Sequence, residues 1–322
     1  MMRRPVLRFP FSVFRFPMLL SFIVPVYNAA AAFEECVASL RPLLDSGVAE
    51  VVAVDDGSEV PLKADCAGLR IIRQQHRGAA AARNAGIAAA QGDFIWPVDA
   101  DDVVLADGIE CLLDDLRAMP AEVPLFHIGA MVKQERSCER PAVGAPDASL
   151  TQRCVPLRLL RPRTSITDHT TNIIRRSWLA EHPELRYADD MSLLEDTVFS
   201  LGVVESAESC LCNDSYRFYC NRTYNASSTA GAWAEGRSRR FTVDICRFFR
   251  FLRQFAERHS QSDNVQQFYE RYRYVYLRVM AVKGCPWSDI SSVMAIVGRV
   301  RWYQLPLYRL FTYLCRLLRS KR

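Results

Sequence analysis

The sequence has few of the signals that mark cofactor-binding or disulfide-stabilised proteins. No GxGxxG turn follows the first apolar run, which continues instead as Pro25-Val26-Tyr27-Asn28-Ala29-Ala30, so a dinucleotide-binding domain is not expected. No GxxxxGK[ST] segment is present, which argues against a P-loop nucleotidase. The eleven cysteines form no CxxC pair. Such spacing suits neither a zinc site nor a disulfide framework, so reduced thiols in a cytoplasmic protein are expected.

Long uncharged apolar segments are also missing. In residues 1–17, four arginines and three prolines interrupt every apolar run, so a secretory signal is not expected. We expect this segment to be a disordered leader, or translation to begin at Met18. Near the other end, Arg309 and Arg316 interrupt the apolar positions of 307–318, and a spanning helix needs about twenty nearly uncharged residues.

Acidic residues are absent from Ser291 onward, which reveals an uneven charge distribution. Residues 232–322 carry 18 Lys and Arg against 6 Asp and Glu, and the net charge of the whole chain is +5. Such a basic region favours an anionic partner, either phospholipid or nucleic acid. In 307–318 the apolar residues share one helical face, which favours a helix lying in the membrane interface. A basic helix packed on the domain is the alternative.

Apolar, β-branched runs alternate with helical patterns in the first hundred residues. The expected strands are 19–26, 51–54, 69–72 and 93–98, and the expected helices are 29–44 and 79–90. This order predicts an α/β fold with a doubly wound, mainly parallel sheet and right-handed crossovers. Further on we expect a helix at 109–116, a strand at 123–132, a long loop at 133–165, a strand and helix at 170–179, and aromatic helices at 241–255 and 272–280.

Three carboxylates, Asp99, Asp101 and Asp102, follow the expected strand 93–98. Ligands bind at the carboxyl ends of strands in open α/β sheets, and crowded carboxylates repel one another unless a cation lies between them. These acids can therefore hold a divalent metal with a phosphorylated ligand. The alternative is an acidic N-cap for a helix beginning near Val103. The sequence alone leaves both interpretations open.

Five segments follow one another along the chain: SFIVPVYN, VVAVDDGS, HRGAAAARNAGIAAAQGDFIWPVDADD, LLEDTVF and YRFYCNRTYNASS. In this order they resemble the inverting glycosyltransferases of family 2, which have the GT-A fold. The resemblance covers residues 19–230 and implies a GT-A domain at 18–231. A basic helical region at 232–322 follows, and its charge and amphipathic tail favour association with membranes. The QxxRW motif of processive members is absent, so we expect one sugar to be transferred per encounter.

The resemblance implies transfer of one sugar from a nucleoside diphosphate, with UDP-sugars favoured, to a hydroxyl of a glycan or lipid-linked glycan, as in cell-surface polysaccharide biosynthesis. It also implies Mg²⁺ or Mn²⁺, which neutralises the leaving diphosphate. Asp101 is the expected direct ligand. Asp99 is expected to contact the ribose, or the metal through water, and Asp102 remains the residue for which helix capping is an alternative.

Other residues of the matching segments are expected to bind the donor. The resemblance gives Asp56 a hydrogen bond from the base, whereas Asp55 should point to the opposite side if the strand continues. Pro25, Tyr27 and Asn28 are expected to line the base pocket.

Two arginines are expected near the phosphates. Arg83 can reach phosphate or pin Asp99, and an ordinary structural salt bridge is the alternative. Arg222 is expected to close over the diphosphate.

Catalysis by inversion requires a base for the acceptor hydroxyl, and a carboxylate in a partly desolvated site can serve. The resemblance favours Asp196 as this base, with Glu195 second. The alternative is that both are simply acids at the start of a helix. His76 and His169 lie near predicted loops of the site. A lone histidine is more often structural, and contact with the substrate is the alternative for each.

Together these observations predict a cytoplasmic enzyme bound peripherally to the inner face of the cell membrane, with no nucleic-acid partner. Two other classes stay open. One is a non-catalytic sugar-nucleotide-binding protein; the other is a nucleic-acid-binding protein that uses the basic tail, although nothing in 19–230 favours it. The sequence does not identify the sugar or acceptor. Acceptor selectivity is expected in 133–170 and the C-terminal helices.

Overall fold

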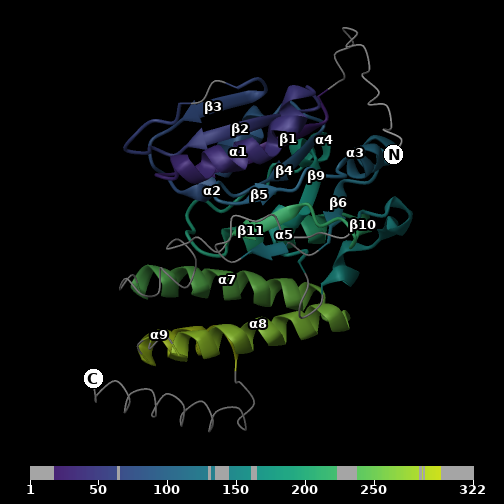
Figure 1. Ribbon diagram of the computed structural model, residues 1–322. Helices are drawn as coiled ribbons and strands as arrows, with labels where there is room; N and C mark the ends of the chain where they lie inside the picture. The colour runs from purple at the N-terminus through teal and green to yellow at the C-terminus, as the bar shows by residue number, and fades with distance from the viewer. Residues whose placement is uncertain are drawn as a thin grey trace.

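The computed structural model describes residues 18–63, 66–129, 132–134, 145–160, 165–222, 238–282, 285 and 287–298 (Figure 1). Within these residues a large sheet has the strand order β3-β2-β1-β4-β9-β6-β10-β8, and a small sheet has the order β5-β11-β7. The first strands of the large sheet are β1 (Leu20–Val26), β2 (Ala49–Asp55), β3 (Leu69–Arg73) and β4 (Phe94–Pro97). The helices that connect them are α1 (Ala30–Asp45) and α2 (Ala79–Ala89).

The first half of the large sheet is parallel, as predicted. β1 pairs in parallel with both β2 and β4, and β2 pairs in parallel with β3. Every residue of β2 is buried because helices cover both faces of the sheet. α1 and α3 (Glu110–Ala118) share one apolar core with Phe22 and Trp96. α2, α4 (Arg176–Glu181) and α5 (Glu195–Ser206) pack on the opposite face with Ile23 and Ile95.

The second half of the sheet is mixed. β9 (Asn172–Arg175) lies antiparallel between β4 and β6 (Leu125–Ile128). β10 (Cys210–Asn213) pairs in parallel with β6 and antiparallel with β8 (Gln152–Cys154). β8 and two 3₁₀ turns, η1 (Ala148–Leu150) and η2 (Pro156–Leu159), lie within the predicted loop 133–165.

The predicted single strand 123–132 is wrong. β6 belongs to the large sheet, whereas β7 (Val132–Gln134) belongs to the small one. The break follows from Gly129, where a Cβ atom would lie 2.3 Å from the carbonyl oxygen of Asp214. Only glycine allows this approach of the two backbones, and the chain leaves the large sheet at this point.

The helix expected near Val103 is also wrong. Val103 and Val104 form β5 (Val103–Val104), which pairs antiparallel with β11 (Tyr219–Arg222), and α3 begins only at Glu110. The two β-branched residues favour extended backbone, and the pairing strand comes from far along the chain. Because no helix starts there, the capping alternative for Asp102 is excluded.

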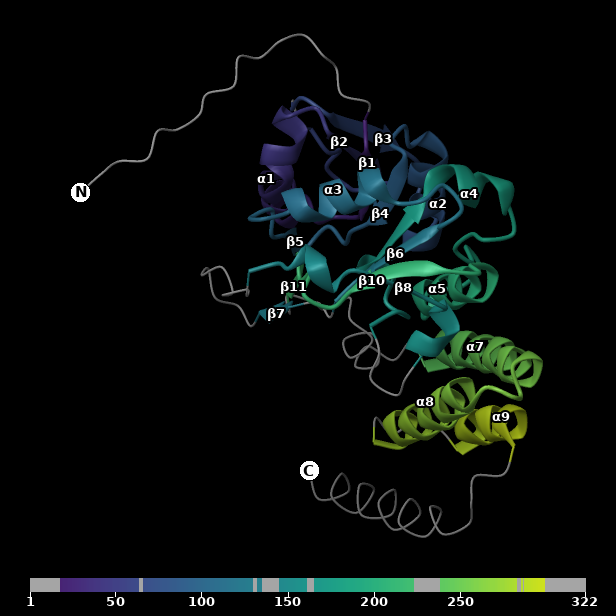
Figure 2. The same ribbon diagram turned by 90° about the vertical axis from the view of Figure 1, so that its right-hand side faces the viewer.

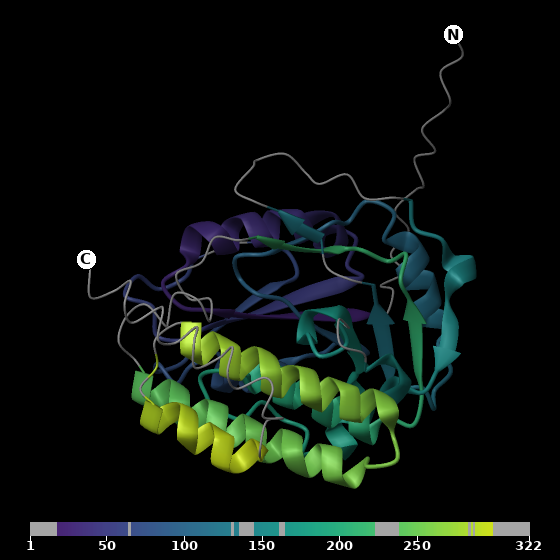
Figure 3. The same cartoon turned by 90° about the horizontal axis from the view of Figure 1, so that it is seen from below.

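The C-terminal region is a layer of helices below the sheet domain (Figures 1 and 2), and it faces the viewer in Figure 3. It contains α7 (Ser238–Arg258), α8 (Asp263–Val282) and α9 (Trp287–Val297), of which α9 was not predicted. Apolar residues of these helices share one core with Leu193, Leu201 and Val204. No helix in the described ranges is long and apolar enough to cross a membrane. The leader 1–17 and the amphipathic segment 307–318 lie outside the described residues.

Candidate active site

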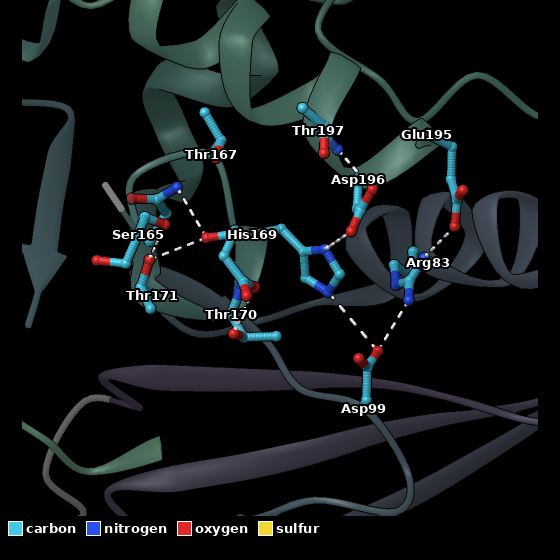
Figure 4. Close-up of polar contacts among 12 residues, drawn as sticks. Arg83, Asp99, Ser165, Thr167, His169, Thr170, Thr171, Glu195, Asp196 and Thr197 are labelled. Atoms are coloured by element: carbon cyan, nitrogen blue, oxygen red, sulfur yellow. Dashed lines mark hydrogen bonds and ion pairs between the residues drawn. The ribbon is translucent and has the colours of Figure 1, made fainter. Parts of the chain in front are cut away.

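Arg83 joins two acidic segments of the chain (Figure 4). Its guanidinium donates to Asp99 Oδ1 at 2.8 Å and to Glu195 Oε1 at 3.0 Å. The Arg83 side chain is only 7 % exposed and lies over the Tyr187 ring, 5.3 Å from its centroid. Arg83 therefore pins Asp99, as the sequence suggested, and also holds the start of α5. Contact with phosphate stays a prediction.

The packing of α2 explains why Arg83 reaches this position. Gly86 lies one turn further along the helix, and a Cβ atom there would come within 2.6 Å of Ile23 Cγ2 on β1. The glycine thus lets α2 approach the sheet closely, together with the alanines at 80–82. Asn84 fixes the other side of α2, since its side chain exchanges two hydrogen bonds with the backbone of Tyr187, at 2.8 and 2.9 Å.

His169, which the sequence placed near the site but did not distinguish from a structural histidine, lies between two of the site's acids. It opens the 3₁₀ turn η3 (His169–Thr171), where Asp168 Oδ1 accepts from the Thr170 backbone and hydroxyl. Its Nε2 lies 3.6 Å from Asp99 Oδ1 and its Nδ1 lies 3.9 Å from Asp196 Oδ2. The side chain is 3 % exposed, yet neither ring nitrogen has a hydrogen-bond partner in the described structure. Both ring nitrogens thus face carboxylates at ion-pair distance, beyond hydrogen-bond range.

Asp99 and Asp196 lie on either side of His169 but have opposite electrostatic environments. Burial acts to raise the pKa of Asp99, but the charge of Arg83, assisted by His169, holds it well below its usual value. Desolvation, followed by the like charge of Glu195, raises the pKa of Asp196 to about 6, against the attraction of His169. The Asp196 side chain nevertheless stays 37 % exposed.

Glu195 and Asp196 occupy the first turn of α5. Both residues are therefore acids at the start of a helix, as the alternative interpretation of the sequence stated. It does not account for the pairing of Glu195 with Arg83 or for the proximity of Asp196 to His169. The preceding residue, Leu194, has a φ of 65°, a left-handed conformation that is uncommon for leucine.

Asp56 organises the loop that leads into α2. Its carboxylate accepts from Gln74 Nε2 at 2.7 Å and from the backbone N–H groups of Arg77 and Gly78 at 2.9 and 2.8 Å. His76 Nδ1 lies 2.9 Å from the same carboxylate. The expected contact of Asp56 with the base of the nucleotide stays a prediction.

Asp55 points to the opposite side, as predicted. It accepts from the backbone N–H groups of Ser58 and Leu62 and from Arg73. The two neighbouring acids therefore fix two different loops.

The residues predicted for the base pocket lie at the same edge of the sheet. Pro25 is in β1, and the Tyr27 ring, 48 % exposed, stacks on His76 with centroids 4.1 Å apart. Asn28 has a φ of 50° and links the loops after β1 and β2. Its N–H donates to Ser58 Oγ and its Oδ1 accepts from the Glu59 N–H, both at 2.9 Å.

The acids predicted for the metal divide between two environments. Asp102 is 1 % exposed and accepts a hydrogen bond from the Tyr219 hydroxyl, whereas Asp99 and Asp101 are partly exposed at the turn after β4. Both ion pairs of Asp99 use Oδ1. Two such carboxylates fit a hard divalent cation, which commonly takes one or two protein carboxylates and completes its shell with phosphate and water. The described residues contain no preassembled group of three ligands.

Arg222 is placed only in part. Its backbone belongs to β11, opposite Gln134 of β7, and its side chain lies outside the described structure. The predicted contact with the diphosphate stays a prediction.

The sequence match of the family model for glycosyl transferase family 2 spans residues 21–182, half of the chain. The chain belongs to glycosyl transferase family 2. Among its curated relatives, EpsJ of Bacillus subtilis, described as an uncharacterized glycosyltransferase, is 29 % identical over 199 residues, which is 59 % of this chain and 57 % of EpsJ. The succinoglycan biosynthesis protein ExoO of Rhizobium meliloti is 28 % identical over 201 residues, with the same two shares. These matches cover little more than half the length of each relative.

A solved structure also supports the fold. Residues 1–349 of S. aureus TarS, in complex with UDP-GlcNAc, superpose with a TM-score of 0.61 at 17 % identity, covering 87 % of this chain and 79 % of that one. The predicted GT-A fold of this family 2 chain is therefore confirmed.

Proposed function

We propose that this protein is an inverting glycosyltransferase that moves one sugar from a nucleoside diphosphate to a hydroxyl of a glycan or lipid-linked glycan. The observation that carries the proposal is that His169 lies between Asp196, whose pKa is raised to about 6, and Asp99 of the Arg83–Asp99 ion pair at the carboxyl end of β4. A UDP-sugar donor is favoured by the UDP-GlcNAc complex of TarS. A role in polysaccharide biosynthesis is supported by the name of ExoO.

Asp196 is the proposed general base. It takes the proton of the acceptor hydroxyl while the acceptor oxygen bonds to the anomeric carbon and the bond from that carbon to the diphosphate oxygen breaks. Attack from the side opposite the diphosphate inverts the anomeric configuration. A carboxylate with a pKa near 6 is ionised at neutral pH and is a stronger base than an ordinary aspartate.

The remaining roles belong to residues that bind and orient the donor. Asp101 and Asp99 would hold Mg²⁺ or Mn²⁺, which when bound supplies neutralisation of charge on the leaving diphosphate. Arg83 keeps Asp99 ionised and positioned. Asp56 and Tyr27 are proposed to bind the base, and Arg222 the diphosphate.

We also propose that the enzyme acts in the cytoplasm, peripherally bound to the inner face of the cell membrane. The excess of 18 basic over 6 acidic residues in 232–322 supports attraction to anionic lipid. A lipid-linked acceptor would be found at that surface.

A panel of nucleotide sugars tests the proposal. UDP-, GDP- and dTDP-sugars are assayed for thermal stabilisation of the protein and for slow hydrolysis, with Mg²⁺, with Mn²⁺ and with chelator. We expect one UDP-sugar to give both effects, and hydrolysis to disappear in Asp196→Asn while stabilisation persists. Stabilisation without turnover in the unmodified protein, with every donor and acceptor, would identify a sugar-nucleotide-binding protein instead.

A further inference from the structure

The segment that carries the proposed base begins with a strained residue. Leu194 has a φ of 65° and immediately precedes Glu195, the first residue of α5. Among the described non-glycine residues only Asn28 shares a positive φ. Asparagine tolerates this conformation well, whereas leucine adopts it only where surrounding structure holds it. The direction in which α5 presents Glu195 and Asp196 therefore depends on contacts that keep Leu194 in place.

Those contacts come from α7 in the C-terminal helical layer. Asp244 Oδ2 accepts from both the backbone N–H of Ser192, at 3.0 Å, and its hydroxyl, at 2.9 Å. Asp244 is 2 % exposed, so its carboxylate relies for its solvation on these donors and on Arg247, whose Nη1 lies 3.8 Å from Asp244 Oδ1. Arg247, one turn further along α7, donates to the carbonyl oxygen of Asp190 at 2.6 Å.

Apolar packing reinforces this attachment. Leu193 and Leu194 are buried in the same hydrophobic core as Ile245, Phe248 and Phe249 of α7. The loop therefore has polar contacts to α7 at 190 and 192, and its residues 193 and 194 lie in the core to which α7 contributes. A loop held in this way cannot relax at Leu194 without disturbing α7.

The neighbouring helix α8 contacts the other side of the site. The Tyr272 hydroxyl lies 3.5 Å from Thr167 Oγ1, two residues before His169. Thr167 is labelled beside His169 in Figure 4. The C-terminal layer thus contacts two segments of the site. α7 contacts the loop that precedes Glu195 and Asp196, and α8 contacts the segment that carries His169.

We propose that Asp244 is a positioning residue for the transfer reaction: it holds the left-handed turn at Leu194 that aims Glu195 and Asp196. The C-terminal helices are then part of the catalytic apparatus, in addition to any role in membrane attachment. The inference rests on the proposed function, since it needs Asp196 to act in the reaction. The family-model match ends at residue 182, so this contact lies outside the region that the family match covers.

The test compares the variant Asp244→Asn with the control variant Arg258→Gln. Asparagine has nearly the same shape as aspartate but lacks its negative charge. Arg258 pairs with Glu205 through two contacts, at 2.7 and 2.8 Å; this control therefore loosens the same two helices at the far end of α5, about two and a half turns from Asp196. Ser192→Ala, which removes one hydrogen bond at an exposed residue, is the second test variant in case Asp244→Asn folds poorly.

Two measurements are made on each full-length variant. Hydrogen exchange of the amides at 191–197, without substrate, reports on the turn itself. Turnover at saturating donor, together with the donor dissociation constant, reports on catalysis. For Asp244→Asn we expect faster exchange and a loss of turnover of about tenfold or more, as for a displaced catalytic group, with donor affinity unchanged. Ser192→Ala should give the same pattern more weakly, and Arg258→Gln should match the unmodified protein.

Unchanged exchange in Asp244→Asn and Ser192→Ala would overturn the proposal, as would faster exchange with undiminished turnover in an active enzyme. A similar loss in Arg258→Gln would also overturn it, because general loosening of the helices would then suffice. If the unmodified protein transfers no sugar, the proposed function fails, and exchange alone decides whether Asp244 holds the turn.

Discussion

Two aspartates in the site acquire opposite properties from their neighbours. The charge of Arg83 keeps the pKa of Asp99 low against the effect of burial, whereas desolvation, followed by the like charge of Glu195, raises the pKa of Asp196 to about 6. The first carboxylate is suited to permanent negative charge and the second to proton transfer. Environments that separate the pKa values of neighbouring acids in this way are common where such acids have different roles.

Asp196→Asn should abolish transfer and stabilise the fold. The folded-state pKa of Asp196 lies above the ordinary aspartate value of 3.8, so the folded protein binds more protons than the unfolded chain between these values. Above pH 6, ionised Asp196 therefore disfavours the fold. We expect the variant to gain about 1 kcal/mol at pH 7, a figure reduced for solvent screening at a partly exposed side chain.

Urea unfolding at pH 7 and pH 4 checks this expectation. The gain should be much smaller at pH 4, where Asp196 is protonated in the folded protein, and should vanish only below the ordinary aspartate value of 3.8, where the unfolded chain is protonated as well. A variant less stable than the parent at pH 7 would contradict the electrostatic interpretation. Transfer activity near that of the parent would contradict the assignment of the base.

His169→Gln should move the acidic limb of the pH–rate profile to higher pH. The attraction of His169 lowers the pKa of Asp196 below the value that desolvation and Glu195 would otherwise give. Without it, Asp196 protonates at higher pH, and the rate at saturating donor should begin to fall at higher pH than in the parent. His182→Gln is the control, because His182 contacts Trp178. A profile unchanged in shape would show that His169 does not influence the base.

The environment of His169 is a part of the site that could not be predicted from the sequence. Asp99, Asp101 and Asp56 follow apolar strand patterns, so their positions at one edge of the sheet could be predicted. His169 follows a long segment without periodicity, and its environment depends on Asp99 and Asp196, which are distant in sequence. A lone histidine in a loop carries no local signal of that environment.

Helix α2 is the element that determines the geometry of the cluster. It is predicted correctly from its alanine-rich sequence, but its close contact with β1 depends on Gly86 facing Ile23. The strands show the same contrast between what the local sequence predicts and what depends on contacts with distant segments. The buried strands β1, β2 and β4 and the half-buried β3 were predictable from apolar runs, whereas short β5, β8 and β11 depend on pairing partners from distant segments.

Gly86→Ala should lower both stability and activity by displacing α2 from the sheet. The added Cβ would meet Ile23 Cγ2 at 2.6 Å, and overpacking of this kind typically costs about 1–3 kcal/mol. Movement of α2 also shifts Arg83 relative to Asp99. Urea unfolding and turnover measure the two effects. In Ile23→Ala/Gly86→Ala the clash is absent, so turnover should recover in part, and strictly additive losses would contradict the steric explanation.

In the molecule as a whole, the boundary expected at 231 separates two regions of sequence but not two independent cores. Leu160, Leu193 and Leu201 of the sheet domain are buried with residues of α7, α8 and α9 in a single cluster. Composition revealed the basic character of the last ninety residues. It could not reveal that their apolar faces complete the core beneath α5, because the helical pattern does not identify the surface on which a helix packs.

Two truncations separate the structural and membrane roles of the C-terminal region. A chain ending at Gly298 keeps α9, which ends at Val297, and therefore the shared core. It should keep the melting temperature and turnover of the full chain in detergent-free solution. It should also bind vesicles containing anionic phosphatidylglycerol much more weakly than the full chain does, since the missing segment 299–322 holds seven basic residues and no acidic ones.

A chain ending at 237 lacks all three C-terminal helices, so it exposes the apolar surface of Leu193, Leu201 and Val204 and should aggregate. Vesicle flotation, light scattering and thermal unfolding measure these outcomes. Equal vesicle binding by the full chain and the chain ending at Gly298 would place membrane attachment elsewhere, and a stable, monomeric chain ending at 237 would contradict the shared core.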